Sequence, residues 1–364
     1  MRLSNAARLG RIGLLALAVA SLVVGVSGGL LRLGVALPAV TLAAALLHGA
    51  LMTGGFFGTV IGIERAVAVG TPSAFAAPLA SGLASLLLLA GWPAVGAWLL
   101  AAASAALVAV NLLIVRRQRA PHTILLAVAS GAWLVGNLAF ARGAPVGQVL
   151  PWWFDFLVLT IAAERLEMTR LMRRRPSAQP LLVLILVALL AGSALVAWQP
   201  RAGDIVYGAA LVALSAWLAV FDIARRTVRA DGLARYAAVC LLGGYAWLAV
   251  AGGAWLAVAA LGWPLRDVAL HALGLGFVVS MILGHAPIIL PAIARVKLPF
   301  GNWFYVPLAA LHASLVVRFL PALGLPASWP IGGALNAAAL VLFMAAVAYS
   351  IRRGSRPARP RAAD

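Results

Sequence analysis

The sequence is poor in charged residues and in cysteine, and each shortage excludes a class of protein. Only 10% of the 364 residues are charged, whereas 64% are hydrophobic. A soluble domain is about half apolar and a quarter charged, so a soluble globular protein is excluded. The single cysteine, Cys240, excludes a disulfide framework, a cysteine-based zinc site and a Cys-x-x-Cys-His haem attachment. We therefore expect a membrane protein whose chemistry does not use thiols.

Long apolar segments recur along the whole chain, each sufficient to cross about 30 Å of hydrocarbon. Glycine, proline and arginine separate them. The segments are predicted at Arg11–Leu31, Val40–Ile63, Ala74–Gly91, Ala94–Val115, Thr123–Phe140, Val146–Ala163, Leu181–Ala197, Asp204–Phe221, Tyr236–Leu261, Val268–Ile293, Trp303–Leu320 and Ile331–Ile351. We predict an all-α bundle of about twelve transmembrane helices, with a single membrane domain over residues 1–351 and a basic tail over 352–364.

Acidic residues are also scarce, and the excess of arginine lies on one side of the predicted bundle. The formal net charge is +19, but 23 of the 28 Lys and Arg residues fall on the side of the two termini. Cytoplasmic loops carry such an excess, so both termini are predicted in the cytoplasm of a bacterial-type inner membrane. The first segment, although its basic start also fits a signal peptide, lacks a cleavage site and is retained as a helix. The basic flanks indicate contacts with anionic lipids rather than nucleic acid.

Three histidines fall in the outer half of the predicted membrane, on three different helices. They are His48 on the second helix, His271 on the tenth and His312 on the eleventh, whereas His285 lies nearer the cytoplasmic side of the tenth. A neutral imidazole is a common ligand of haem iron and of copper. His48 paired with either His271 or His312 would suit a bis-histidine haem. The alternative is that each histidine only forms a hydrogen bond across a helix pair.

Two further charged residues lie in the outer half of the predicted membrane. Arg318, near the outer end of the eleventh helix, is a candidate partner for haem propionates, although anchoring at the interface is its plainer role. Asp155 lies inside the sixth helix, where a carboxyl group is expected to be protonated or bound to an arginine.

Similar charged residues end three helices that are four apart in the sequence. Glu64 and Arg65 end the second helix, Glu164 and Arg165 end the sixth, and Arg295 ends the tenth. This recurrence suggests three repeats of four helices. Each glutamate is expected to pair with a neighbouring arginine, although a proton path is an alternative. Pro287 and Pro291 interrupt the tenth helix beside His285, a feature that also marks binding sites in transporters.

Three segments carry a resemblance to the NnrS family, haem- and copper-containing membrane proteins linked to nitric oxide and nitrosative stress. HGALMTGGF in the second helix resembles the family's His-Ala-His-Glu-Met-x-x-Gly-Phe, and HALGLGFVVSMILGH in the tenth resembles a segment that opens His-Ala. LHASLVVR in the eleventh resembles a Leu-His-x-x-x-x-x-Arg segment. The chain is more distantly similar to subunit I of the haem–copper oxidases, in which helices two and ten hold the low-spin haem. The resemblance implies haem b and admits copper.

The chain also departs from these patterns. Ala50 and Leu51 replace the second histidine and the glutamate of the second-helix motif. Helices six and seven contain no histidine, so an oxidase-type binuclear centre is not expected, and only His285 and His312 remain for a second metal.

Three functions stay open at this point. The first is an NnrS-like haem protein that handles nitric oxide or transfers electrons to a respiratory redox partner, with or without oxidoreductase activity. The second is a small-solute transporter or channel, in which Glu64, Asp155 and His285 would line an aqueous cavity. The third is a non-catalytic assembly factor of a respiratory complex. Facing imidazoles would favour the first.

Overall fold

The computed structural model describes residues 5–38, 42–168 and 176–355, and this part of the chain contains helices and no strands. Twelve helical spans are long and apolar enough to cross a membrane, as predicted. They are formed by α1 (Asn5–Arg32); α2 (Leu42–Ala50), η2 (Leu51–Gly58) and α3 (Thr59–Val69); η3 (Pro72–Phe75) and α4 (Ala76–Leu89); α5 (Pro93–Arg117); α6 (Pro121–Ala141); α7 (Val146–Met168); α8 (Ala178–Leu195); α9 (Pro200–Phe221); α11 (Gly232–Leu256) and η4 (Ala257–Leu261); α12 (Arg266–His271), η5 (Ala272–Val279) and α13 (Ser280–Ala294); η6 (Asn302–Phe304), α14 (Tyr305–Phe319) and η7 (Leu320–Leu323); and α15 (Trp329–Gly354). The short helix α10 (Ala224–Thr227) lies between two spans.

Proline and glycine set many of the helix boundaries. Proline occupies the first turn of α5, α6 and α9, where its missing N–H would have no intrahelical partner. Gly70 ends α3 in the left-handed conformation, with φ of 76°, which an L side chain adopts at a cost. The last helix continues to Gly354, three residues beyond residue 351, where the membrane domain is predicted to end. Residues 356–364 of that tail lie outside the described part.

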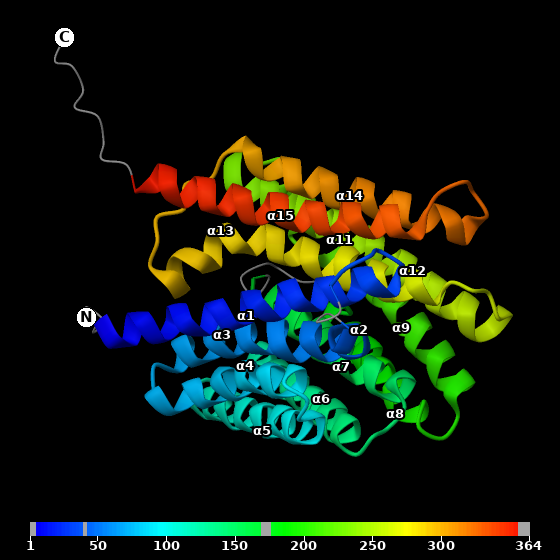
Figure 1. Ribbon diagram of the computed structural model, residues 1–364, viewed down its shortest axis with the longest axis horizontal. Helices are drawn as coiled ribbons and strands as arrows, with labels where there is room; N and C mark the ends of the chain where they lie inside the picture. Colours follow the sequence, from blue (N-terminus) through cyan, green and yellow to red (C-terminus); the bar gives the residue numbers. More distant parts are fainter. Residues whose placement is uncertain (1–4, 39–41, 169–175, 356–364) are drawn as a thin grey trace, which may run out of the picture.

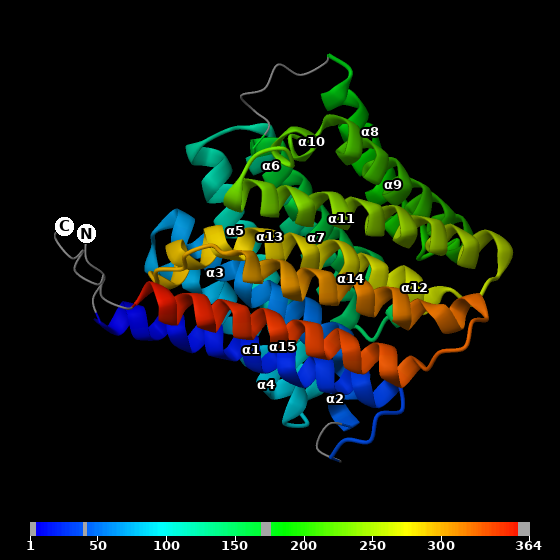
Figure 2. The same ribbon diagram turned by 90° about the horizontal axis from the view of Figure 1, so that it is seen from above.

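The second, sixth and tenth spans lie inside the bundle. In their most apolar stretches 56%, 72% and 61% of the residues are buried inside the protein, whereas in the other spans this fraction lies between 28% and 50%. Helices α4, α5, α6 and α7 pack in chain order, as do α8, α9 and α11, and α1 closes the bundle against α15. Figures 1 and 2 show the helices side by side along the long axis, with both termini at the same end. An even number of crossings requires this.

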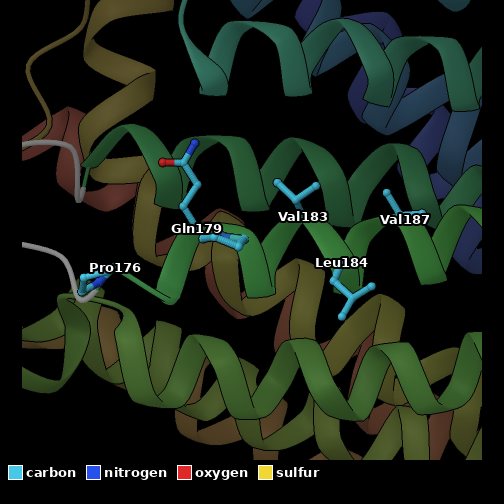
Figure 3. Close-up of a pocket in the computed structure, with 6 residues that line it drawn as sticks. Pro176, Gln179, Val183, Leu184 and Val187 are labelled. Atoms are coloured by element: carbon cyan, nitrogen blue, oxygen red, sulfur yellow. The ribbon is translucent and has the colours of Figure 1, made fainter.

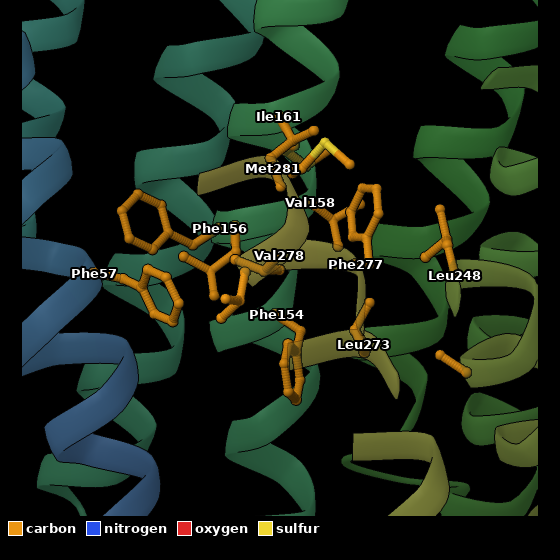
Figure 4. Packing of buried hydrophobic residues seen from close by; sticks show 14 of the residues in the cluster. Phe57, Phe154, Phe156, Val158, Ile161, Leu248, Leu273, Phe277, Val278 and Met281 are labelled. Atoms are coloured by element: carbon orange, nitrogen blue, oxygen red, sulfur yellow. The ribbon is translucent and has the colours of Figure 1, made fainter. Parts of the chain in front are cut away.

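The three interior spans meet in an apolar cluster. Phe57 of η2, Phe156 and Val158 of α7 and Val278 of η5 are all buried in it (Figure 4). By contrast, large apolar side chains such as Leu46 and Leu184 are exposed on the outside of the bundle. Such a surface is stable only in a hydrocarbon environment, which agrees with a multi-pass membrane protein.

Glycine allows the first two helices to approach closely. A Cβ atom at Gly28 of α1 would lie 2.2 Å from the Ala44 carbonyl oxygen of α2, closer than any real contact. A Cβ atom at Gly29 would lie 3.0 Å from Cε1 of His48. The small residues of α1 therefore fix the position of α2 and leave room for the imidazole of His48.

We predict that Gly28→Ala destabilises the protein by about 1–3 kcal/mol, because the added methyl group must push α1 away from α2. Gly13→Ala in the same helix is the matched control, since a Cβ atom there meets nothing within 4 Å. Thermal unfolding of both purified variants in detergent measures the difference. Equal stability of the two variants would contradict the close approach of α1 and α2.

Candidate functional site

The imidazoles of His48 on α2 and His271 on α12 face each other. Their ring centroids are 6.3 Å apart and their planes differ by 28°. Two imidazoles bound to one metal ion through bonds of about 2 Å have ring centroids roughly 6 Å apart. The centroid spacing is therefore of the size that two ligands of one ion would have. Of the two partners that the sequence offered for His48, the structure brings the ring of His271 beside it.

Hydrogen bonds place the proton of each ring on Nδ1. Nδ1 of His48 lies 2.7 Å from the carbonyl oxygen of Gly25 on α1. Nδ1 of His271 lies 3.0 Å from the carbonyl oxygen of Asp267 and 3.0 Å from its carboxylate oxygen Oδ1. These oxygens only accept hydrogen bonds, so Nδ1 donates and Nε2 keeps its lone pair. Both rings are thus in the tautomer that binds a metal through Nε2.

Arg318 of α14 is held beside His271 by an ion pair. Its Nε and Nη2 atoms donate to the two carboxylate oxygens of Asp267 at 2.9 and 2.8 Å. Nη1 donates to Oδ1 of Asn336 on α15 at 3.3 Å, and Asn336 donates to Ser314 at 2.7 Å. Nη2 also lies 3.3 Å from both ring nitrogens of His271. The arginine is buried, so the expectation that it anchors the helix at the membrane interface is wrong.

Sequence reasoning missed Asp267, Asn336 and Arg32. Asp267 lies four residues before His271, a spacing that puts two side chains on one helix face, and this signal could have found it. Asn336 lies 18 residues beyond Arg318 on another helix, and nothing in the sequence pairs them. Arg32, at the end of α1, acts electrostatically on His48, as Arg318 does.

Both facing histidines lie close before a stretch of π-helix. The π-helical segment η2 begins three residues after His48, and η5 begins directly after His271. Such wider turns are rare and often occur at functional sites. They continue into the apolar cluster of Figure 4, to which η2 contributes Phe57 and η5 contributes Val278.

His312 forms a separate cluster. The indole N–H of Trp247 on α11 points to its Nδ1 at 3.3 Å, and Ser280 lies 3.2 Å from its Nε2. Both ring nitrogens therefore have protein partners from neighbouring helices. This arrangement matches the structural alternative that the sequence left open for each histidine, namely a hydrogen bond between two helices.

His285 belongs to a third cluster, at the end of the bundle where the termini lie. Its Nδ1 donates to the Met281 carbonyl at 2.6 Å, so its Nε2, 2.6 Å from Nη2 of Arg165, is the acceptor. Glu64 pairs with Arg65, which also interacts electrostatically with Glu164. The Glu-Arg sequences thus meet in one network, as paired charges in a low-dielectric interior require. They lie before the ends of the second and sixth spans, which continue to Val69 and Met168, and not at the ends as predicted.

Asp155 of α7 is fully buried, and its partners are hydroxyl groups. Ser193 of α8 donates to its Oδ2 at 2.6 Å, and Tyr207 of α9 also interacts with the carboxyl group. Among the described residues no arginine pairs with it, so of the two expected states, protonated or bound to an arginine, the second is wrong.

Two cavities open on the outside of the described bundle. The larger, of about 640 Å³, follows α8, where Val183, Leu184 and Val187 project from one stretch of helix (Figure 3). The smaller, of about 320 Å³, lies at Gln199–Ile205. Neither is lined by Glu64, Asp155 or His285, the residues that a transport path would use. No group of three or more His, Cys, Asp or Glu residues in the described part is placed to hold a metal ion.

A family profile described as "Domain of unknown function (DUF8744)" matches residues 11–352. The chain belongs to that family. The match covers nearly the whole membrane bundle, from the first turns of α1 to the last turn of α15. No curated protein and no solved structure matches the chain.

Asp222 lies one residue beyond the end of α9. Its carboxyl group interacts electrostatically with Arg165 and His285. Its Oδ1 accepts a hydrogen bond from the backbone N–H of Ala224 at 2.7 Å, which fixes the start of α10. Burial raises the pKa of this carboxyl group, although Arg165 opposes the shift. Because the folded protein binds this proton more tightly than the unfolded chain, Asp222 destabilises the fold increasingly as pH rises above its ordinary pKa of 3.8.

We predict that Asp222→Asn, which keeps an acceptor for Ala224 but cannot ionise, gains thermal stability relative to the wild type as pH rises. The gain is absent below the ordinary pKa and levels off once pH passes the raised pKa. Melting temperatures in detergent over this range test it, with Asp231→Asn at an exposed position as control. If the difference in melting temperature between Asp222→Asn and the wild type is the same at every pH, the pKa of this carboxyl group is not raised in the folded protein.

Proposed function

We propose that this protein is a multi-pass membrane haem protein that holds one b-type haem between His48 and His271. The observation that carries the proposal is the facing pair of imidazoles, 6.3 Å apart, each with Nδ1 bonded to oxygen and Nε2 in the ligand form. Such a haem supplies an iron that exchanges one electron or binds a small diatomic molecule. Arg32 lies near His48 and is a candidate partner for a propionate, since Arg318 already has protein partners at all three guanidinium nitrogens.

The helix arrangement supports an oxidase-like architecture. The second, sixth and tenth spans are the most buried, which is what three repeats of four helices would produce. The two proposed ligands come from the second and tenth spans, as for the low-spin haem in the haem–copper oxidases that the sequence resembles. We include this arrangement in the proposal.

The packing between α7, α9 and α11 favours a protein with one bound haem over a protein with two. Aromatic rings fill this region: Phe154 packs edge-on against Trp255, Trp255 packs against Tyr207, and Tyr245 packs against Phe277 of η5. His285 and His312 would each have to give up hydrogen bonds to bind copper. We therefore propose electron transfer or the handling of nitric oxide or a similar diatomic molecule, in keeping with the NnrS resemblance, rather than a reaction at two metals.

The two alternatives have less support. A transporter needs an aqueous path, and the described cavities contain none of the charged residues that would line it. An assembly factor would use buried polar groups only to hold helices together. That role accounts for His285 and His312, but it gives no reason for the close pairing of the rings of His48 and His271.

We predict that the protein, purified in detergent after haem-replete expression, shows a Soret band and sharp α and β bands on reduction with dithionite. His48→Ala and His271→Ala remove these bands, because each deletes one ligand. His312→Ala keeps them and is the matched control, because that ring lies in a separate cluster. A colourless wild-type protein would end the haem proposal and direct the work to transport assays.

We further propose an inner-membrane location with both termini in the cytoplasm, which puts the two histidines toward the outer face and a respiratory redox partner within reach there. The prediction uses a Cys240→Ser background with one new cysteine at an exposed loop position. An impermeant maleimide added to spheroplasts labels Ala327→Cys, between α14 and α15, and spares Gln118→Cys, between α5 and α6. The reverse pattern would invert the topology.

A further inference from the structure

We propose that Asp267 and Arg318 together set how strongly His271 donates electrons to the iron, and thereby the reduction potential of the site. This inference rests on the haem ligation proposed above. Neither residue is proposed to touch the cofactor; both act through the ring of His271 and are positioning residues. The two ligands of the iron are consequently unequal.

The two ligands differ in the oxygen atoms that lie within hydrogen-bond distance of Nδ1. His48 bonds to the neutral backbone carbonyl of Gly25 at 2.7 Å. His271 has in addition a carboxylate oxygen of Asp267 at 3.0 Å. A carboxylate that accepts a hydrogen bond from the Nδ1–H group makes the imidazole more basic. An imidazole bound in this way donates electrons more strongly to its metal. His271 is therefore the stronger donor of the pair.

Arg318 holds the carboxylate in this position and opposes its charge. It binds both oxygens of Asp267 with two nearly parallel hydrogen bonds, a geometry in which a carboxylate has little freedom to turn. Only 6% of its side chain is accessible, and Asn336 holds the third nitrogen. Because water is largely excluded, the positive charge lies close to His271 with little screening.

The two charges have opposite effects on the iron. The negative carboxylate favours the ferric state and lowers the potential, whereas the positive guanidinium favours the ferrous state and raises it. Removing Asp267 should raise the potential, and removing Arg318 should lower it. A pair that only clamped α12 to α14 would, when broken, reduce stability in both variants without shifting the potentials in opposite directions.

The test is a redox titration of the purified haem-loaded protein, with the potential read from the α band. We expect Asp267→Asn to raise the potential and to weaken haem retention by about 10–100-fold, and Arg318→Gln to lower the potential. Asp267→Glu and Arg318→Lys keep the charges but not the two parallel hydrogen bonds, so each should shift the potential less than the matching neutral variant does. They also cover the case in which a neutral variant fails to fold.

Asp204 and Arg266 provide the matched control. They form an ion pair at 3.8 Å, and neither is a contact of the His271 ring. Asp204→Asn changes the net charge as Asp267→Asn does and should leave the potential nearly unchanged. Intact spectra with unchanged potentials, or shifts of equal sign in Asp267→Asn and Arg318→Gln, would overturn the inference alone. A wild-type protein without haem would overturn both it and the proposed function.

Discussion

The hydrocarbon core of a membrane offers no water, so a polar side chain inside it needs a partner from the protein. This constraint explains the distribution of polar groups along the bundle. His48, His271, Asp267 and Arg318 form one cluster, and His285, Arg165, Glu64 and Arg65 form another, nearer the chain termini. The cluster of Phe57, Phe156, Val158 and Val278 is apolar and occupies the interior where the three central spans meet.

The same constraint fixes the chemistry of the histidines. The neighbours of the ring nitrogens decide which of them carries the proton. For His285 and His312 the neighbours occupy both nitrogens. For His48 the hydrogen bond to Gly25 puts the proton on Nδ1 and leaves the lone pair on Nε2. His271 has Nη2 of Arg318 near Nε2, at a distance longer than the ion pair that holds this arginine to Asp267. The proposed ligation therefore requires that the contact of Arg318 with Nε2 of His271 be given up.

The function that we propose from these observations is a membrane haem protein with one bis-histidine site. The interior spans two and ten would supply the ligands, and span six would complete the centre of the bundle with apolar and aromatic side chains. Tyr207 of α9 packs against Trp255 of α11, and Tyr245 of α11 packs against Phe277 of η5, so aromatic rings fill this part of the interior. Such a site is suited to exchanging single electrons or to binding one diatomic molecule.

The sequence by itself determined the twelve spans and most of their limits, because length, hydropathy and helix-ending residues are local properties. The predicted segment Ala94–Val115, for example, is α5 at Pro93–Arg117. It also supplied His48 as a candidate, since an imidazole in hydrocarbon is rare. Only the tertiary structure decided that His271 rather than His312 faces it, that Arg318 is bound to Asp267, and that Asp155 meets hydroxyl groups instead of an arginine. These outcomes depend on the rotation and depth of packed helices, which apolar sequences hardly constrain, because lipid-facing and protein-facing positions both favour the same side chains.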